Sequence, residues 1–210
     1  MNYCQFRNDV IKRMAHAGGV TPILPPEYQQ VEYIQSYNSS STIAGTSYWH
    51  INTGVYSFAD FEVDAQVTGD TAVKVCGSEV YKCLQRHNAA NPYFSCYNSN
   101  SSYYITTAPL VTRSKIGWID NKIYVNDVFV TNFNKTTSTD QFILFGAGAY
   151  FYKDIRFYSV KLYDSNGGLI RNFIPCYRIN DNKPGMYDVV NDVFYTGTGS
   201  SGGLIVGNNV

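Results

Sequence analysis

Hydrophobic and polar residues alternate with a period of two over most of this chain. The segment FEVDAQV (61–67) is the clearest case, because its hydrophobic residues share one parity and Glu62, Asp64 and Gln66 share the other. This pattern predicts a β-strand with one buried and one solvated face. Similar segments follow at 72–76, 80–84, 93–97, 103–107, 114–119, 122–126, 128–133, 142–146, 155–163, 169–175, 186–190, 193–196 and 203–206.

Turn-forming pairs separate these segments: Asp120-Asn121, Asn126-Asp127, Asn166-Gly167, Pro184-Gly185 and Asn191-Asp192. Within IRFYSVKLY (155–163) the hydrophobic parity switches, which predicts a β-bulge near Tyr158–Ser159. Many short strands joined by polar turns favour an all-β fold, a two-sheet antiparallel jelly-roll sandwich. We expect Trp118 to belong to its core.

The N-terminal segment has a different periodicity. Its apolar residues recur at spacings of three and four, which predicts an amphipathic helix ended by Gly18-Gly19. We expect residues 1–19 to form an anchoring or oligomerisation arm, 20–26 a Pro-rich linker, and 27–210 the sandwich. The helix either docks on another subunit or folds back on its own sandwich. The predicted assembly interface is Tyr3, Phe6, Val10 and Met14.

Charge and cysteine content narrow the function. Lys and Arg total 16 and Asp and Glu total 16, so no net positive charge indicates nucleic-acid binding. No apolar run approaches the roughly 20 residues of a membrane helix, and no secretory leader is evident. The five cysteines lack zinc-site spacing, so we interpret them as buried free thiols of a protein made in a reducing cytosol. A Cys76–Cys83 or Cys83–Cys96 bridge is the alternative.

Four segments resemble the concanavalin A-like (laminin-G-like) jelly-roll domains: LPPEYQQVEYIQSY (24–37), HINTGV (50–55), SKIGWIDNKIYVNDV (114–128) and the ending between residues 154 and 199. The resemblance covers roughly residues 24–200. Domains with this opening and ending are common in virion proteins of bacteriophages that infect gut bacteria, and occur in surface proteins of those bacteria.

The resemblance implies a non-enzymatic virion structural protein, a capsid- or tail-associated decoration or fibre component made in the bacterial cytoplasm. Its expected partners are other virion proteins and further copies of itself. The alternative function is a carbohydrate-binding module that recognises host-surface or mucosal glycans. Neither function requires nucleic acid, a membrane or a cofactor.

A glycoside hydrolase is the third possibility, because this fold also hosts glucanases. Their signature, Glu-x-Asp-x-x-Glu on one strand, supplies the nucleophile and the general acid. Glu62 and Asp64 match the first two positions, but Val67 occupies the third. We therefore interpret the two carboxylates as a solvated strand face and expect no catalytic residues. The three histidines are too scattered to predict a metal site, and a calcium ligand at Asp127 or Asp140 has no support beyond their place in turns.

Aromatic residues in polar surroundings are the candidate binding residues. Trp49, Tyr103 and Tyr104 lie among Ser, Thr and Asn, and flat rings beside hydroxyl groups suit a sugar or a protein partner. The alternative is that strand alternation places half of each aromatic pair in the core. The Asp-rich stretch 172–199, with Cys176, we interpret as a closing β-hairpin rather than an active site.

Overall fold

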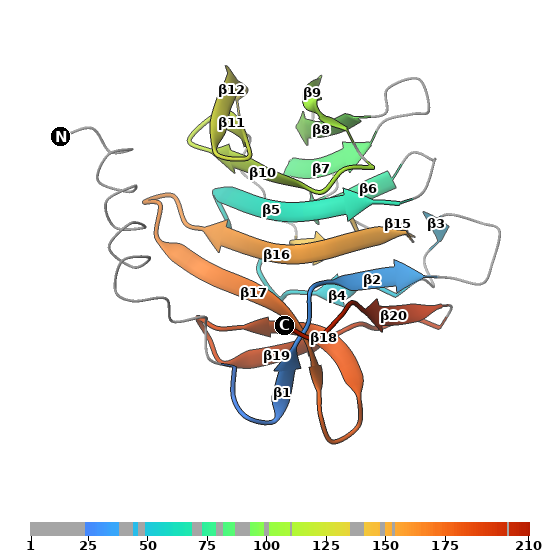
Figure 1. Cartoon of the computed structure of the whole chain (residues 1–210). Helices are drawn as coiled ribbons and strands as arrows, with labels where there is room; N and C mark the ends of the chain where they lie inside the picture. Colours follow the sequence, from blue (N-terminus) through green and yellow to red (C-terminus); the bar gives the residue numbers. More distant parts are fainter. Residues whose placement is uncertain are drawn as a thin grey trace.

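A computed structural model describes residues 24–37, 44–45, 49–68, 73–78, 82–86, 93–98, 101–109, 111–134, 141–147, 150–152, 154–200 and 202–210. Within these residues every regular element is a β-strand and every strand pairing is antiparallel (Figure 1). The all-β prediction is confirmed. The predicted helix, with Tyr3, Phe6, Val10 and Met14, lies outside the described residues.

The strands of the described residues form a large, a medium and a small sheet. The large sheet has the order β12-β11-β10-β5-β16-β17-β18-β19, and β1, β2 and β20 pair beside this path. Its strands are β1 (Tyr28–Gln30), β2 (Ile34–Tyr37), β5 (Asp60–Val67), β10 (Ser114–Ile119), β11 (Lys122–Val125), β12 (Val128–Asn132), β16 (Ile155–Tyr163), β17 (Leu169–Arg178), β18 (Lys183–Asp188), β19 (Val193–Thr196) and β20 (Gly203–Val206).

The medium sheet has six strands in the order β4-β13-β6-β7-β8-β9. They are β4 (Ile51–Asn52), β13 (Ile143–Leu144), β6 (Val73–Ser78), β7 (Lys82–Arg86), β8 (Tyr93–Asn98) and β9 (Ser101–Pro109). The small sheet contains β14 (Gly146–Ala147), β15 (Tyr150–Tyr152) and β3 (Ala44–Gly45).

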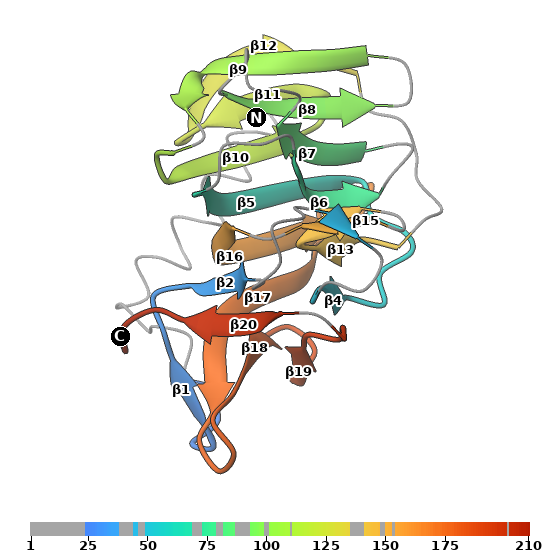
Figure 2. The same cartoon turned by 90° about the vertical axis from the view of Figure 1, so that its right-hand side faces the viewer.

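One hydrophobic core joins the large and medium sheets into a sandwich (Figure 2). Phe61 and Trp118 from the large sheet and Phe94 and Ile105 from the medium sheet are all 0% exposed and belong to this cluster. Trp118 is therefore a core residue, as predicted, and its Nε1 donates to the carbonyl oxygen of Phe133 at 2.9 Å. No described helix is long and apolar enough to cross a membrane.

The predicted β-bulge is present. The register between β16 and β5 shifts between Phe157 and Ser159. Ahead of the bulge β16 pairs with β2, and after it β16 pairs with β17, while β5 stays on its other edge. The extra residue thus restores the hydrophobic parity and keeps both halves of β16 facing the core.

Most predicted turns are confirmed, and one is wrong. Asp120 and Asn121 link β10 to β11 with φ values of 49° and 58°, as expected of a two-residue hairpin turn. Pro184-Gly185 lies instead inside β18, and the chain turns at residues 179–182. Gly185 serves packing: an added Cβ would lie 2.3 Å from the carbonyl oxygen of Tyr195.

The closing hairpin is held by a buried carboxylate. Asp188 is 0% exposed, and its Oδ1 accepts hydrogen bonds from the backbone N–H groups of Asn172 (3.0 Å) and Val190 (3.1 Å). The Nε of Arg171 lies 3.3 Å from Asp188 Oδ2. The Asp188 carboxylate therefore stabilises the turn of the closing hairpin.

The described thiols match the free-cysteine interpretation. Cys76, Cys96 and Cys176 are buried thiols outside any disulfide, so neither alternative bridge forms. Burial raises the pKa of Cys176 to about 12, which keeps this thiol protonated at neutral pH.

Candidate functional site

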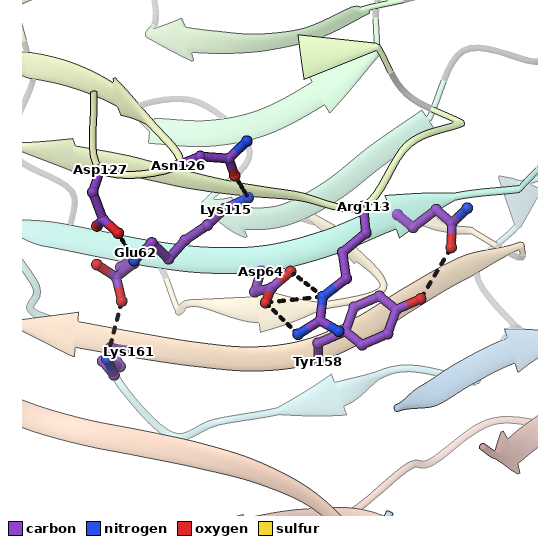
Figure 3. Close-up of polar contacts among 9 residues, drawn as sticks. Glu62, Asp64, Arg113, Lys115, Asn126, Asp127, Tyr158 and Lys161 are labelled. Atoms are coloured by element: carbon purple, nitrogen blue, oxygen red, sulfur yellow. Dashed lines mark hydrogen bonds and ion pairs between the residues drawn. The ribbon is translucent and has the colours of Figure 1, made fainter. Parts of the chain in front are cut away.

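The solvent face of the large sheet carries a row of polar residues from strand β5. Because Phe61, Val63 and Ala65 are buried in the core, Glu62 and Asp64 point to the opposite side (Figure 3). Each carboxylate is largely covered, with side chains 15% and 16% exposed respectively.

Both carboxylates are held by cations, from Lys161 in β16 and from Arg113 immediately before β10. Arg113 binds Asp64 in a bidentate manner, with Nε to Oδ1 at 3.0 Å and Nη2 to Oδ2 at 2.8 Å. The hydrogen bond to Asp64 raises the pKa of Arg113. Lys161 Nζ donates to Glu62 Oε1 at 3.0 Å. Each negative charge is therefore neutralised within the face.

An aromatic ring and an amide extend the contacts of Arg113 (Figure 3). The guanidinium carbon of Arg113 lies 3.9 Å from the ring centroid of Tyr158, a cation–π distance. The hydroxyl of Tyr158 donates to Gln66 Oε1 at 3.0 Å, and Gln66 Nε2 donates to the carbonyl oxygen of Val111 at 2.6 Å. These side chains are thus pre-organised before any ligand arrives.

The glucanase signature is incomplete on this strand. A retaining enzyme needs an acid and a nucleophile about 5–5.5 Å apart, with one of them protonated. Val67 fills the position of the third signature residue and is 0% exposed. Asp60 shares the parity of Glu62, but it is 4% exposed and its Oδ1 accepts the Asp120 N–H at 3.2 Å, so it anchors the adjacent turn.

Two aromatic residues extend this face towards the edge of the sheet. Gly117 pairs with Glu62 on one side and with Tyr124 on the other, and Tyr124 pairs with Phe129. The rings of Tyr124 and Phe129 meet edge to face with centroids 6.0 Å apart, and Phe129 is 50% exposed. One cross-strand row therefore contains two aromatic rings and the Glu62–Lys161 ion pair.

A second ion pair borders the rings. Lys115 Nζ lies 2.5 Å from Asp127 Oδ2, and the Asp127 side chain is 73% exposed (Figure 3). Sequence reasoning did not single out Tyr124, Phe129 or the two lysines. The available signal was that Tyr124 and Phe129 lie opposite each other across the Asn126-Asp127 turn.

The three predicted binding aromatics do not lie together. Trp49 is next to β4, whereas Tyr103 and Tyr104 belong to β9. These two strands form opposite edges of the medium sheet. Trp49 and Tyr103 pack against the core, as the strand-alternation alternative expects. Tyr104 is adjacent to Tyr103 in an extended strand and so faces outwards. A binding role for these residues stays a prediction.

Within the described part of the chain no three His, Cys, Asp or Glu side chains gather as a metal site. Asp127, one of the two turn aspartates considered for calcium, is engaged by Lys115. Asp140 lies outside the described residues.

Fold and face together define an antiparallel β-sandwich with a polar and aromatic sheet surface. No protein-family model matches the sequence, and no curated protein matches it. A crystal structure of a proposed carbohydrate binding protein from Bacteroides ovatus ATCC 8483 is similar, with a TM-score of 0.50 and 13% sequence identity. The match covers 85% of this chain and 60% of that protein. At this identity the likeness supports the fold alone.

Proposed function

We propose that this chain is a non-enzymatic carbohydrate-binding module with a concanavalin A-like jelly-roll fold. The observation that carries the proposal is the cross-strand row on the large sheet. There the half-exposed ring of Phe129, its partner Tyr124 and the Glu62–Lys161 ion pair share one surface.

The chemistry of this row suits a sugar. Aromatic rings offer an apolar surface to the C–H face of a pyranose ring, while a paired carboxylate and ammonium group can accept from and donate to its hydroxyls. Because Val67 replaces the third carboxylate of the glucanase signature, this strand offers sugar-binding groups without the general acid that cleavage requires.

Two similarities support the same assignment. The Bacteroides ovatus protein of similar fold is described as carbohydrate-binding, and the sequence resembles jelly-roll domains of phages that infect gut bacteria and of the surfaces of those bacteria.

The test is a glycan array followed by calorimetric titration of any hit. We expect Phe129→Ala to weaken binding about ten-fold, a typical loss for a central aromatic contact. Tyr56→Ala is the matched control, because Tyr56 is 60% exposed and lies outside this face. A hit that is equally strong in both variants, or the absence of any hit, would overturn the proposal.

A virion structural role is the second candidate, favoured by the phage-like opening and ending of the sequence. It is compatible with glycan binding, since a decoration or fibre protein can display a binding module. Size-exclusion chromatography of the full chain and of a variant lacking residues 1–20 tests the predicted arm. If both are monomeric and neither binds virion proteins, the anchoring role fails.

A further inference from the structure

We propose a second carbohydrate site on the outer face of the medium sheet, over strands β8 and β9, that takes a neutral saccharide. The large and medium sheets share one core, so their outer faces point away from each other (Figure 2). The inference rests on the proposed function for the kind of ligand, but not on the site described above.

Strand alternation places mainly hydroxyl-bearing side chains on this face, with Pro109 opposite Tyr93. In β8, Phe94 and Cys96 are 0% exposed core residues, so the residues between and beside them face outwards. In β9, Ile105 is 0% exposed and Tyr103 packs against the core. The outward residues are Tyr93, Ser95 and Tyr97 of β8 and Ser102 and Tyr104 of β9.

The strand register brings two of the phenol rings together. Ser95 pairs with Tyr104, and Tyr97 pairs with Ser102, so Tyr97 and Tyr104 are diagonal neighbours on one face. Diagonal residues of adjacent strands lie about 7–8 Å apart, within reach of aromatic side chains. Ser95 is 0% exposed, whereas both tyrosines are partly exposed. Tyr97 and Tyr104 therefore lie next to Ser95 on this face.

The charged and apolar residue content of this surface indicates which class of ligand it can bind. Strands β8 and β9 contain no Asp, Glu, Lys or Arg, so these two strands offer no counter-charge to a uronic acid, a sulfated sugar or an amino sugar, and the row that contains Ser95 reaches a cation only at Lys74, two strands away. None of the most exposed large hydrophobic side chains of the described residues lies on β8 or β9. This surface therefore differs from the apolar centre of a protein–protein interface. Phenol rings with hydroxyls instead suit the ring faces and hydroxyls of a neutral saccharide.

The test is native affinity electrophoresis of the full chain in gels containing hydroxyethylcellulose, xylan, galactomannan or polygalacturonate. The variant Tyr97→Ser/Tyr104→Ser removes both rings and keeps both hydroxyls. Tyr124→Ser/Phe129→Ser changes the large sheet, and Tyr56→Ser is the control. We expect at least one neutral polysaccharide to retard the wild type, and the Tyr97/Tyr104 variant to raise the apparent dissociation constant about ten-fold. Unchanged melting temperatures establish that the variants are folded.

The outcomes separate the two proposals. If only the Tyr124/Phe129 variant loses retardation, this second site is wrong and the proposed function stands. If only the Tyr97/Tyr104 variant loses it, the second site is supported and the large-sheet site is wrong. Retardation by polygalacturonate alone overturns the assignment to neutral sugars. A wild type retarded by none of the four polysaccharides overturns this inference, and the array then decides the proposed function.

Discussion

Two strand glycines differ in the space that their surroundings leave for a side chain. At Gly185 a Cβ would lie 2.3 Å from the Tyr195 carbonyl oxygen and 2.6 Å from the ring of Phe194. At Gly117 the nearest atoms would be Cδ1 of Ile119 at 3.5 Å and Cβ of Tyr124 at 3.6 Å, which is ordinary contact.

We therefore expect Gly185→Ala to lower the free energy of unfolding by about 2–3 kcal/mol, because the backbone of β19 must move. Gly117→Ala should change it by less than about 1 kcal/mol. Urea denaturation of both variants measures the difference. Equal losses would contradict this packing account of the closing hairpin.

The buried thiol of Cys176 predicts a loss of stability at high pH. Burial raises its pKa from the ordinary thiol value of 9.0 to about 12, so above pH 9 the unfolded chain releases a proton that the folded chain retains. The free energy of unfolding should then fall between pH 9 and pH 12, by at most about 1.4 kcal/mol per pH unit from this group. Below pH 9 the thiol should have no effect on pH dependence.

Urea titrations of the wild type and Cys176→Ala at pH 8, 9.5 and 10.5 check this prediction. The variant should show a shallower decline above pH 9, whatever its stability at pH 8. Parallel declines would mean that the thiol ionises equally in both states.

At the scale of the element, the turn between β10 and β11 sets which residues share a face. Asn121 has a φ of 58°, a conformation that β-branched residues adopt only with strain. We expect Asn121→Val to cost about 1–2 kcal/mol and Asn121→Gly to be nearly neutral. Thermal unfolding measures both.

The same turn has a functional consequence, because it aligns Gly117 with Tyr124. If the proposed sugar site is correct, Asn121→Val should weaken glycan binding and Asn121→Gly should not. A valine variant with full stability and full affinity would show that the turn does not control the register.

The strands could be predicted from the sequence wherever the hydrophobic pattern of neighbouring residues determines them. Period-two alternation found β5 and the parity switch found the bulge after Phe157, because both depend on neighbours within a few residues. The turn predicted at Pro184-Gly185 was wrong for the same reason. The pair has a local turn signal, but Gly185 is needed inside β18 because Phe194 on the next strand leaves no room for a side chain.

The cross-strand rows could not be predicted in this way. Glu62 meets Gly117 and Lys161, partners 55 and 99 positions further along the chain, and no local pattern fixes that register. The face formed by Tyr124, Phe129 and Glu62 therefore emerged only from the folded sheet. Alternation did anticipate that one residue of the Tyr103–Tyr104 pair would be turned towards the core.

At the scale of the whole molecule, the two proposed sites lie on opposite outer faces of one sandwich (Figure 2). A rigid core between them prevents both sites from closing on one short oligosaccharide, so each has to bind a separate stretch of glycan. The formal net charge of the chain is zero, so charge repulsion between copies of the protein does not oppose cross-linking.

A protein with one binding site on each outer face should cross-link polysaccharide chains. We expect the wild type to aggregate beads coated with whichever neutral polysaccharide retards it in the gel, with turbidity as the measurement. Tyr97→Ser/Tyr104→Ser and Tyr124→Ser/Phe129→Ser should each still bind the beads but no longer aggregate them, because one face alone holds one bead. Aggregation that survives in either variant would mean that cross-linking comes from self-association of the chain, and the two-sided arrangement would then be wrong.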